Sequence, residues 1–451
     1  MTGETTHRRR FLAGLAAGAA VVGAGCNGRP WDDDEAGATT FTRSEADSVL
    51  DEPAPAVDRP VPVEPTPKSI ENERSRVDDL LAAVPDSLGP EDVPNGVVRA
   101  SIADRRDSAL EYRTETVDAT GAERYHALRT ARDAREAARA SATTLAAIDA
   151  DREELLSELA DERRALRSTL ESRLEEVAYR GEDDADGRLR GALFYADLED
   201  DLETAERRVD RWDVDAASNV IDVGAGAGDL EFVTATTTVW NHCIDRYESV
   251  TDDRVDLESA FVDALDASVD RADGVDLPDQ GEDDWLEALV DGEVEQGFDQ
   301  TLLWDAVRPV YRGEDRLRDA LEDGRLGPGL AAALRFEQEY RAFEVVRDRF
   351  EDGELTAPET IDTIRTQRTA AISAAESATE AVTRPSLGVA RLADTVRSLE
   401  WTDEAIRRQA DGDPEVNVTL GSEYSEYACL RARLEVLPGA VEAFRDRLLE
   451  G

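Results

Sequence analysis

The residues best suited to chemistry lie in the stretch 220–232, whose sequence is VIDVGAGAGDLEF. A brief apolar run is followed by an acid, Asp222, and by three alternating glycines, Gly224, Gly226 and Gly228. Because glycine has no Cβ, such a run can form a turn that lets the backbone approach a bound cofactor. The same glycines can instead interrupt a helix or let two helices pack closely. The stretch therefore poses a choice between a cofactor site and a structural element.

This stretch resembles the beginning of the class I methyltransferases, which bind S-adenosylmethionine. The resemblance implies that Val220–Gly228 holds the cofactor, with the glycines under its methionine end and Asp222 in the preceding strand. Asp245, which lies 21 residues after Gly224, stands roughly where this family places the acid that holds the ribose hydroxyls. The resemblance covers only a small part of the 451 residues.

A helical pattern in the same region favours the structural interpretation. Side chains on one expected helix face recur every three or four residues: Leu230, Val233, Thr237, Trp240, Ile244 and Tyr247. If this helix is unbroken, no second strand presents Asp245. The β-branched runs that six further strands would need are also missing. We therefore expect a structural role for the glycines and no enzyme activity, with the methyltransferase as the alternative function.

Side chains that commonly bind metals or act as nucleophiles are scarce. The chain has three cysteines and three histidines, and none of them has the spacing of a metal site: Cys26, Cys243, Cys429, His7, His126 and His242. Carboxylates are so numerous that no pair stands out as catalytic. We predict no catalytic residue, no cofactor and no metal. Cys243 and Cys429 either form a disulfide outside the cell or remain two buried thiols.

The N-terminal residues 1–25 predict export. Arg8 and Arg9, with Phe11 and Leu12 shortly after them, resemble the twin-arginine export signal. The apolar segment that follows is rich in alanine and glycine, and it is too short to cross a bilayer of about 30 Å as a helix. Its length is typical of the apolar part of a signal peptide.

The apolar segment ends in GAGC, and its cysteine, Cys26, resembles the lipid-attachment site of exported lipoproteins. This resemblance implies that Cys26 becomes the first residue of the mature protein and carries a lipid. The lipid would hold the protein at the outer face of the cytoplasmic membrane, so the membrane is one expected partner. The alternative is cleavage near Ala24 with Cys26 free.

The composition is strongly acidic. Asp and Glu number 102 against 52 Lys and Arg, for a net charge of -50, and Lys68 is the only lysine. This balance resembles the proteomes of salt-loving archaea, where a surface of this kind stays soluble in molar salt. Together with the export signal, it makes the chain similar to the twin-arginine-exported lipoproteins of such organisms. Nucleic acid is excluded as a partner because it requires a basic face.

The rest of the chain divides into a tether and a helical body. Residues 26–70 contain many prolines and acids with little apolar periodicity, which predicts a disordered tether. A first helical region is expected at 71–272, with one long helix or helical hairpin at 122–180, where no Gly or Pro occurs. A second helical region is expected at 285–451, beyond the acidic turn 273–284.

The fold class that follows is all-α, an elongated helical bundle or set of hairpins. Apolar periodicity predicts further helices in these windows: 188–212, 256–271, 293–311, 329–350, 358–383, 387–410, 422–437 and 439–449. Asn417 begins an NVT triplet, which matches the N-glycosylation acceptor. We expect a membrane-anchored envelope protein that binds or scaffolds an unknown envelope protein or a small solute, in an oligomeric state that the sequence leaves open.

Overall fold

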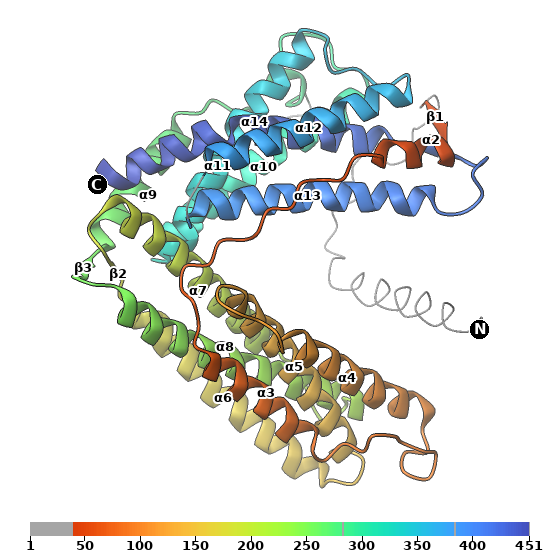
Figure 1. Cartoon of the computed structure of the whole chain (residues 1–451), viewed down its shortest axis with the longest axis vertical. Helices are drawn as coiled ribbons and strands as arrows, with labels where there is room; N and C mark the ends of the chain where they lie inside the picture. The colour runs from red at the N-terminus through yellow and green to blue at the C-terminus, as the bar shows by residue number, and fades with distance from the viewer. Residues whose placement is uncertain (1–38, 282–283, 383–384, 451) are drawn as a thin grey trace.

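The structure is a computed structural model that describes residues 39–281, 284–382 and 385–450. Thirteen α-helices make up nearly all the regular structure in these ranges (Figure 1). The prediction of an all-α fold is therefore confirmed. The predicted export signal at Arg8, Arg9, Phe11 and Leu12, and the predicted lipid site at Cys26, lie outside the described residues.

The long helices form two groups that diverge from a common junction (Figure 1). The N-terminal group contains α3 (Pro67–Leu81), α4 (Gly96–Glu115), α5 (Glu123–Ala146), α6 (Arg152–Glu175), α7 (Ala185–Arg211) and α8 (Val220–Val250). The C-terminal group contains α9 (Glu258–Asp273), α10 (Phe298–Glu322), α11 (Leu326–Glu351), α12 (Ile361–Ala381), α13 (Leu387–Ala410) and α14 (Gly421–Glu450).

Short elements connect distant parts of the chain. Strand β1 (Thr40–Thr42) pairs antiparallel with β4 (Asn417–Thr419), and β2 (Arg180–Gly181) pairs with β3 (Val255–Asp256). A short helix and two 3-10 turns complete the fold: α2 (Arg43–Asp47), η1 (Ser48–Leu50) and η2 (Glu287–Leu289). The β2–β3 pair lies at the junction, next to α7 and α9 (Figure 1).

Polar residues at the helix starts explain where many of the helices begin. Their side chains accept hydrogen bonds from backbone N–H groups of the first turn, in the order α4, α6, α7, α8, α12 and α13: Asn95, Asp151, Asp184, Asn219, Thr360 and Ser386. Each such cap contributes about 1 kcal/mol to helix stability. These caps account for the residue at which each of these helices begins.

The long helix predicted at 122–180 is two antiparallel helices, α5 and α6. The break falls at residues 147–151, where Asp151 accepts hydrogen bonds from the backbone N–H groups of Glu153 and Glu154. An acid at a helix start competes with helix continuation, so no glycine or proline is needed here. The prediction of one unbroken helix is wrong, whereas its alternative, a hairpin, describes the arrangement.

The windows 422–437 and 439–449, predicted as separate helices, join in one helix, α14, with Pro438 inside it. Proline removes one backbone donor and usually kinks a helix, at a cost of about 3 kcal/mol. Here Leu437 and Ala440 on either side of it are fully buried. Packing on both sides of Pro438 therefore outweighs the tendency of proline to end the helix.

Residues 39–66 belong to the folded body, so the predicted disordered tether at 26–70 is wrong from residue 39 onward. After η1, the segment 51–66, which we call the strap, runs along α13 and then past α7 to reach α3 (Figure 1). Its prolines keep it extended, but its polar groups find partners. Arg246 on α8 donates to the carbonyl oxygen of Glu64, and the Thr66 N–H donates to His242.

One apolar core crosses the junction between the two groups. Phe194 of α7 and Tyr247 of α8 stack with ring centroids 4.0 Å apart, and the same cluster continues through Phe261 of α9 to Phe336 of α11. Helix α9 packs against α10, α11 and α14. It belongs with the C-terminal group, although the sequence placed residues up to 272 in the first region.

Candidate functional site

The glycine stretch that suggested a cofactor site forms the first turns of α8. Asn219 caps this helix, and the Asp222 carboxylate accepts a hydrogen bond from the Asn219 N–H at 3.1 Å. The strand and turn that the resemblance to methyltransferases implies are therefore not formed. Asp245 is exposed on the same helix, about 31 Å from Gly224 at 1.5 Å per residue. These two positions are too far apart to hold the two ends of one cofactor.

The glycines instead allow close packing around α8. A Cβ on Gly224 would lie 2.7 Å from the carbonyl oxygen of Ala140 on α5, and one on Gly228 would lie 3.0 Å from the Ala140 Cβ. On another face, a Cβ on Gly226 would lie 2.8 Å from the Trp212 indole nitrogen, which donates to the Gly226 carbonyl oxygen at 3.0 Å. Of the two structural interpretations, close helix approach is the one observed.

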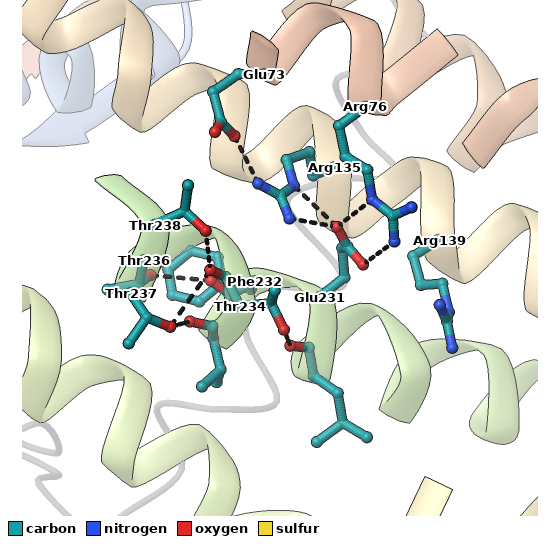
Figure 2. Close-up of polar contacts among 12 residues, drawn as sticks. Glu73, Arg76, Arg135, Arg139, Glu231, Phe232, Thr234, Thr236, Thr237 and Thr238 are labelled. Atoms are coloured by element: carbon teal, nitrogen blue, oxygen red, sulfur yellow. Dashed lines mark hydrogen bonds and ion pairs between the residues drawn. The ribbon is translucent and has the colours of Figure 1, made fainter. Parts of the chain in front are cut away.

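A buried ion-pair network lies at the end of this stretch, at Glu231 of α8 (Figure 2). The Arg135 guanidinium on α5 donates to Glu231 at 2.6 Å and to Glu73 of α3 at 2.7 Å. Arg76 of α3 donates to the other Glu231 oxygen at 2.9 Å. Burial raises the pKa of Glu231, but hydrogen bonds from Arg76 and Arg135 outweigh it and hold the pKa below its usual value.

The threonines that follow Glu231 are satisfied inside α8. Each hydroxyl donates to a backbone carbonyl four residues earlier (Figure 2): Thr234, Thr236, Thr237 and Thr238. With two arginines facing two carboxylates, the network around Glu231 is also balanced in charge. This region joins α3, α5 and α8, and its polar groups pair with one another.

The cysteines and histidines in the described residues have structural contacts. Cys243 and Cys429 are free and buried, so the alternative of two buried thiols describes them, and burial raises the pKa of Cys243 to about 12. His242 accepts from the strap at Thr66, and His126 lies 3.4 Å from the carbonyl oxygen of Arg59 in the strap. Within the described residues, no three His, Cys, Asp or Glu side chains are grouped to hold a metal ion.

A cleft of about 540 Å³ lies where the two helix groups face each other. We call it the inter-group cleft; α7 forms one wall, and α10, α11 and α13 form the others, with the strap at its edge. Six arginines line it: Arg59, Arg207, Arg316, Arg325, Arg335 and Arg391. Six acids line it as well: Asp197, Asp200, Glu203, Asp319, Asp323 and Asp394. The cleft is thus neutral overall in a chain of net charge -50.

Arg59 in the strap ties the two groups together beside the cleft. Its guanidinium contacts Asp197 of α7 at 3.3 Å and Asp394 of α13 at 3.0 Å. Asp197 is buried and also accepts from the Tyr125 hydroxyl at 3.1 Å. The strap thereby fixes the distance between α7 and α13, which face each other across the cleft.

Several charged side chains of the cleft differ from those of the buried network because they have no partner. Arg335 on α11, Arg316 on α10 and Asp200 on α7 make neither a hydrogen bond nor an ion pair within the described part of the chain. Arg316 and Asp200 are exposed at the mouth, whereas Arg335 is half-buried. The cleft can therefore offer both a cationic and an anionic group to a polar ligand.

A buried acid, Glu199, joins the two groups next to the cleft. It lies on α7 and accepts from the Gly327 N–H, at the start of α11, at 3.3 Å. Burial raises the pKa of Glu199 to about 8, although Tyr179, the Gly327 N–H and Arg325 oppose that shift. At neutral pH the folded protein therefore holds a proton that an unfolded chain, with an ordinary glutamate, would release.

We expect the substitution Glu199→Gln to change how stability depends on pH. The folded-state pKa lies above the unfolded value of 4.5, so this group's contribution is full below pH 4.5 and is lost as the pH rises towards 8. Glutamine cannot ionise, so the variant should be more stable than wild type at pH 8 by roughly 1–4 kcal/mol, at about 1.4 kcal/mol per pKa unit. Denaturant unfolding of both proteins at pH 5 and pH 8 measures this, and parallel profiles would contradict it.

The inter-group cleft could not be found from the sequence, because its walls come from helices far apart in the chain. Charged residues at these positions look like ordinary solvated helix faces in so acidic a chain. Asn417, the predicted glycosylation acceptor, lies exposed in β4 and is not one of the residues that line the cleft.

Two family models match the chain, and their limits follow the two helix groups. Residues 68–253 match a family described as a domain of unknown function (DUF8262), and residues 258–446 match another domain of unknown function (DUF8264). The first range spans α3 to α8, and the second spans α9 to most of α14. No curated protein and no solved structure matches the chain. No helix among the described residues is long and apolar enough to cross a membrane.

Proposed function

We propose that the protein is exported, is anchored by a lipid on Cys26 at the outer face of the cytoplasmic membrane, and binds a small polar solute in the inter-group cleft. The anchor rests on the resemblance of Arg8, Arg9, Phe11 and Leu12 to an export signal and of Cys26 to a lipid site. Anionic lipid headgroups would repel a body with so large a negative charge. Buried hydrocarbon must therefore hold it at the membrane.

The observation that carries solute binding is the inter-group cleft. Its volume of about 540 Å³ lies in the range of small-molecule sites, about 300–1,000 Å³. Such sites occur preferentially between domains, where two rigid bodies can hold a ligand between them. Alanine and leucine side chains form part of the wall, and unpaired charged groups on three helices converge on the same space. These features support a binding protein, with the apolar wall burying the solute and the charged groups orienting it.

One purification from native membranes in high salt tests both parts of this proposal. We expect a small polar compound to co-purify with the wild-type protein in near-stoichiometric amount, as measured by mass spectrometry after denaturation. Ala331→Trp fills the cleft from α11 and should remove most of this compound. Ala150→Trp, at an exposed position outside the cleft, is the matched control and should retain it. The intact mass of the purified protein should equal that of the chain without residues 1–25 plus the mass of a lipid.

Two results would contradict the proposal. A wild-type preparation with no bound compound, but with one stoichiometric protein partner, would indicate a scaffold. An intact mass that retains the N-terminal segment, or that lacks any lipid, would remove Cys26 as the anchor. Circular dichroism of Ala331→Trp confirms that the variant is folded before its bound compounds are compared.

A further inference from the structure

The wall of the inter-group cleft contains a cation without a counter-charge, Arg335 of α11. It is half-buried and makes no hydrogen bond or ion pair within the described residues. Burial lowers the pKa of Arg335 to about 10, and the neighbouring Arg391 and Arg316 add to the effect by repulsion. Partial removal of a guanidinium from water costs free energy, and an anion beside Arg335 would offset part of that cost.

The acid that attracts Arg335, Glu339, is already engaged by other arginines. The carboxylate of Glu339, one turn further along α11, accepts from Arg391 and, at 2.7 Å, from Arg433. Arg391 also donates to the side chain of Gln338. Glu339 therefore contributes attraction at a distance but no hydrogen bond to Arg335.

The arginines that are fully buried in the described residues have acidic partners, unlike the half-buried Arg335. Arg135 is held by Glu73 and Glu231, and Arg368 is held by Asp403 through two hydrogen bonds of 2.9 and 2.7 Å. With acids outnumbering bases by 102 to 52, counter-charges are plentiful. Arg335 shares its lack of an acidic partner with the half-buried Arg105 of α4, but only Arg335 lines the cleft, where Arg391 and Arg316 lower its pKa further by repulsion.

We infer that the inter-group cleft binds an anionic group, a carboxylate or a phosphate, at Arg335, with Arg316 at the cleft mouth as a second cation. This inference rests on the proposed function and names the chemical class of its solute. A guanidinium can give two parallel N–H hydrogen bonds to either group, which chloride cannot accept in the same geometry.

The acids at the mouth do not prevent this binding. Asp200, Asp319 and Asp323 are exposed. In molar salt the Debye length is about 3 Å, so exposed charges act only over direct contact distances. Repulsion from the mouth is screened there, whereas a hydrogen-bonded pair on the half-buried wall is screened much less.

Equilibrium dialysis in molar sodium chloride tests the inference with two probes, radiolabelled inorganic phosphate and malonate. We expect the wild-type protein to bind phosphate at one saturable site and malonate to compete for it. Arg335→Gln removes the positive charge and the parallel pair of guanidinium N–H donors, and should weaken phosphate binding at least tenfold. Ala331→Trp, which keeps Arg335 but fills the cleft, should also weaken it.

Arg105→Gln is the matched control. Arg105 on α4 is also half-buried, and burial lowers its pKa as well, but it lies outside the cleft. This variant should bind phosphate like the wild type. If Arg335→Gln binds as tightly as wild type, or if neither probe binds saturably, the inference is overturned. The proposed function would survive that result if Ala331→Trp still loses the co-purified compound, which would then be a solute without an anionic group.

Discussion

Replacing Arg135 with methionine is expected to lower the free energy of unfolding by about 3–5 kcal/mol, because it leaves buried carboxylates without their cation. Arg135 is 6% exposed, and its guanidinium is shared by Glu73 and Glu231, which are 5% and 2% exposed. After the substitution, Glu231 would keep only Arg76, and Glu73 would lose the cation that now binds it. Denaturant unfolding followed by circular dichroism in high salt measures the loss.

The pH dependence of this loss distinguishes an electrostatic cause from a packing defect. Without Arg135, the buried carboxyl groups would take up protons more readily, so the deficit relative to wild type should shrink at pH 5 compared with pH 8. Arg164→Met is the control, because Arg164 is 76% exposed on α6 and its pair with Asp161 contributes about 0–1 kcal/mol. Equal losses in the two variants would mean that the buried network does not stabilise the N-terminal group.

Gly224→Ala is expected to destabilise the protein by about 2–3 kcal/mol, because one added methyl group overpacks the contact between α5 and α8. That methyl carbon would collide with the Thr144 hydroxyl oxygen and would lie 2.7 Å from the carbonyl oxygen of Ala140. The hydroxyl can rotate away, but the backbone carbonyl cannot, so the two helices must separate. Thermal unfolding in high salt measures the effect.

Gly96→Ala serves as the comparison for Gly224→Ala. Gly96 is the first residue of α4, and the nearest atom to an added Cβ is a guanidinium nitrogen of Arg99 at 3.7 Å. There, alanine restricts the unfolded chain without a clash and should leave stability unchanged or raise it by about 0.4–1 kcal/mol. If Gly224→Ala is equally tolerated, α5 and α8 do not need a glycine at their contact.

The sequence predicted the local features of the fold well, because they depend on neighbouring residues. The window 387–410 matches α13 at both ends, since Ser386 caps its start and the apolar period runs unbroken to Ala410. The prediction that the glycines of 220–228 are structural was made from the apolar stripe of the same helix. The apolar periodicity does not predict which helix packs against these glycines. That Ala140 of α5 contacts them is seen only in the structure.

Features that depend on distant segments were missed. Nothing around the prolines of the strap indicates that Arg59 will find Asp197 and Asp394, which are far from it in sequence and from each other. The position of Arg335 on a cleft wall likewise depends on how α7 approaches α11. Local polarity predicted that Arg59 would lie in a solvated, disordered segment and that Arg335 would lie on a solvated helix face. Neither prediction could take account of contacts with distant segments.

The pairing of β1 with β4 sets the order in which the chain can complete its fold during synthesis. Thr42 at the beginning of the described chain is in register with Asn417 near its end. The N-terminal group can assemble as soon as its own helices are made, since domains generally fold as units as the chain emerges. Ahead of this group, η1 and α2 connect the strap to β1, and β1 has no strand partner until β4 leaves the ribosome. Closing that contact is a long-range step that needs both ends of the described chain, so a chain truncated before β4 would leave β1 without its strand partner.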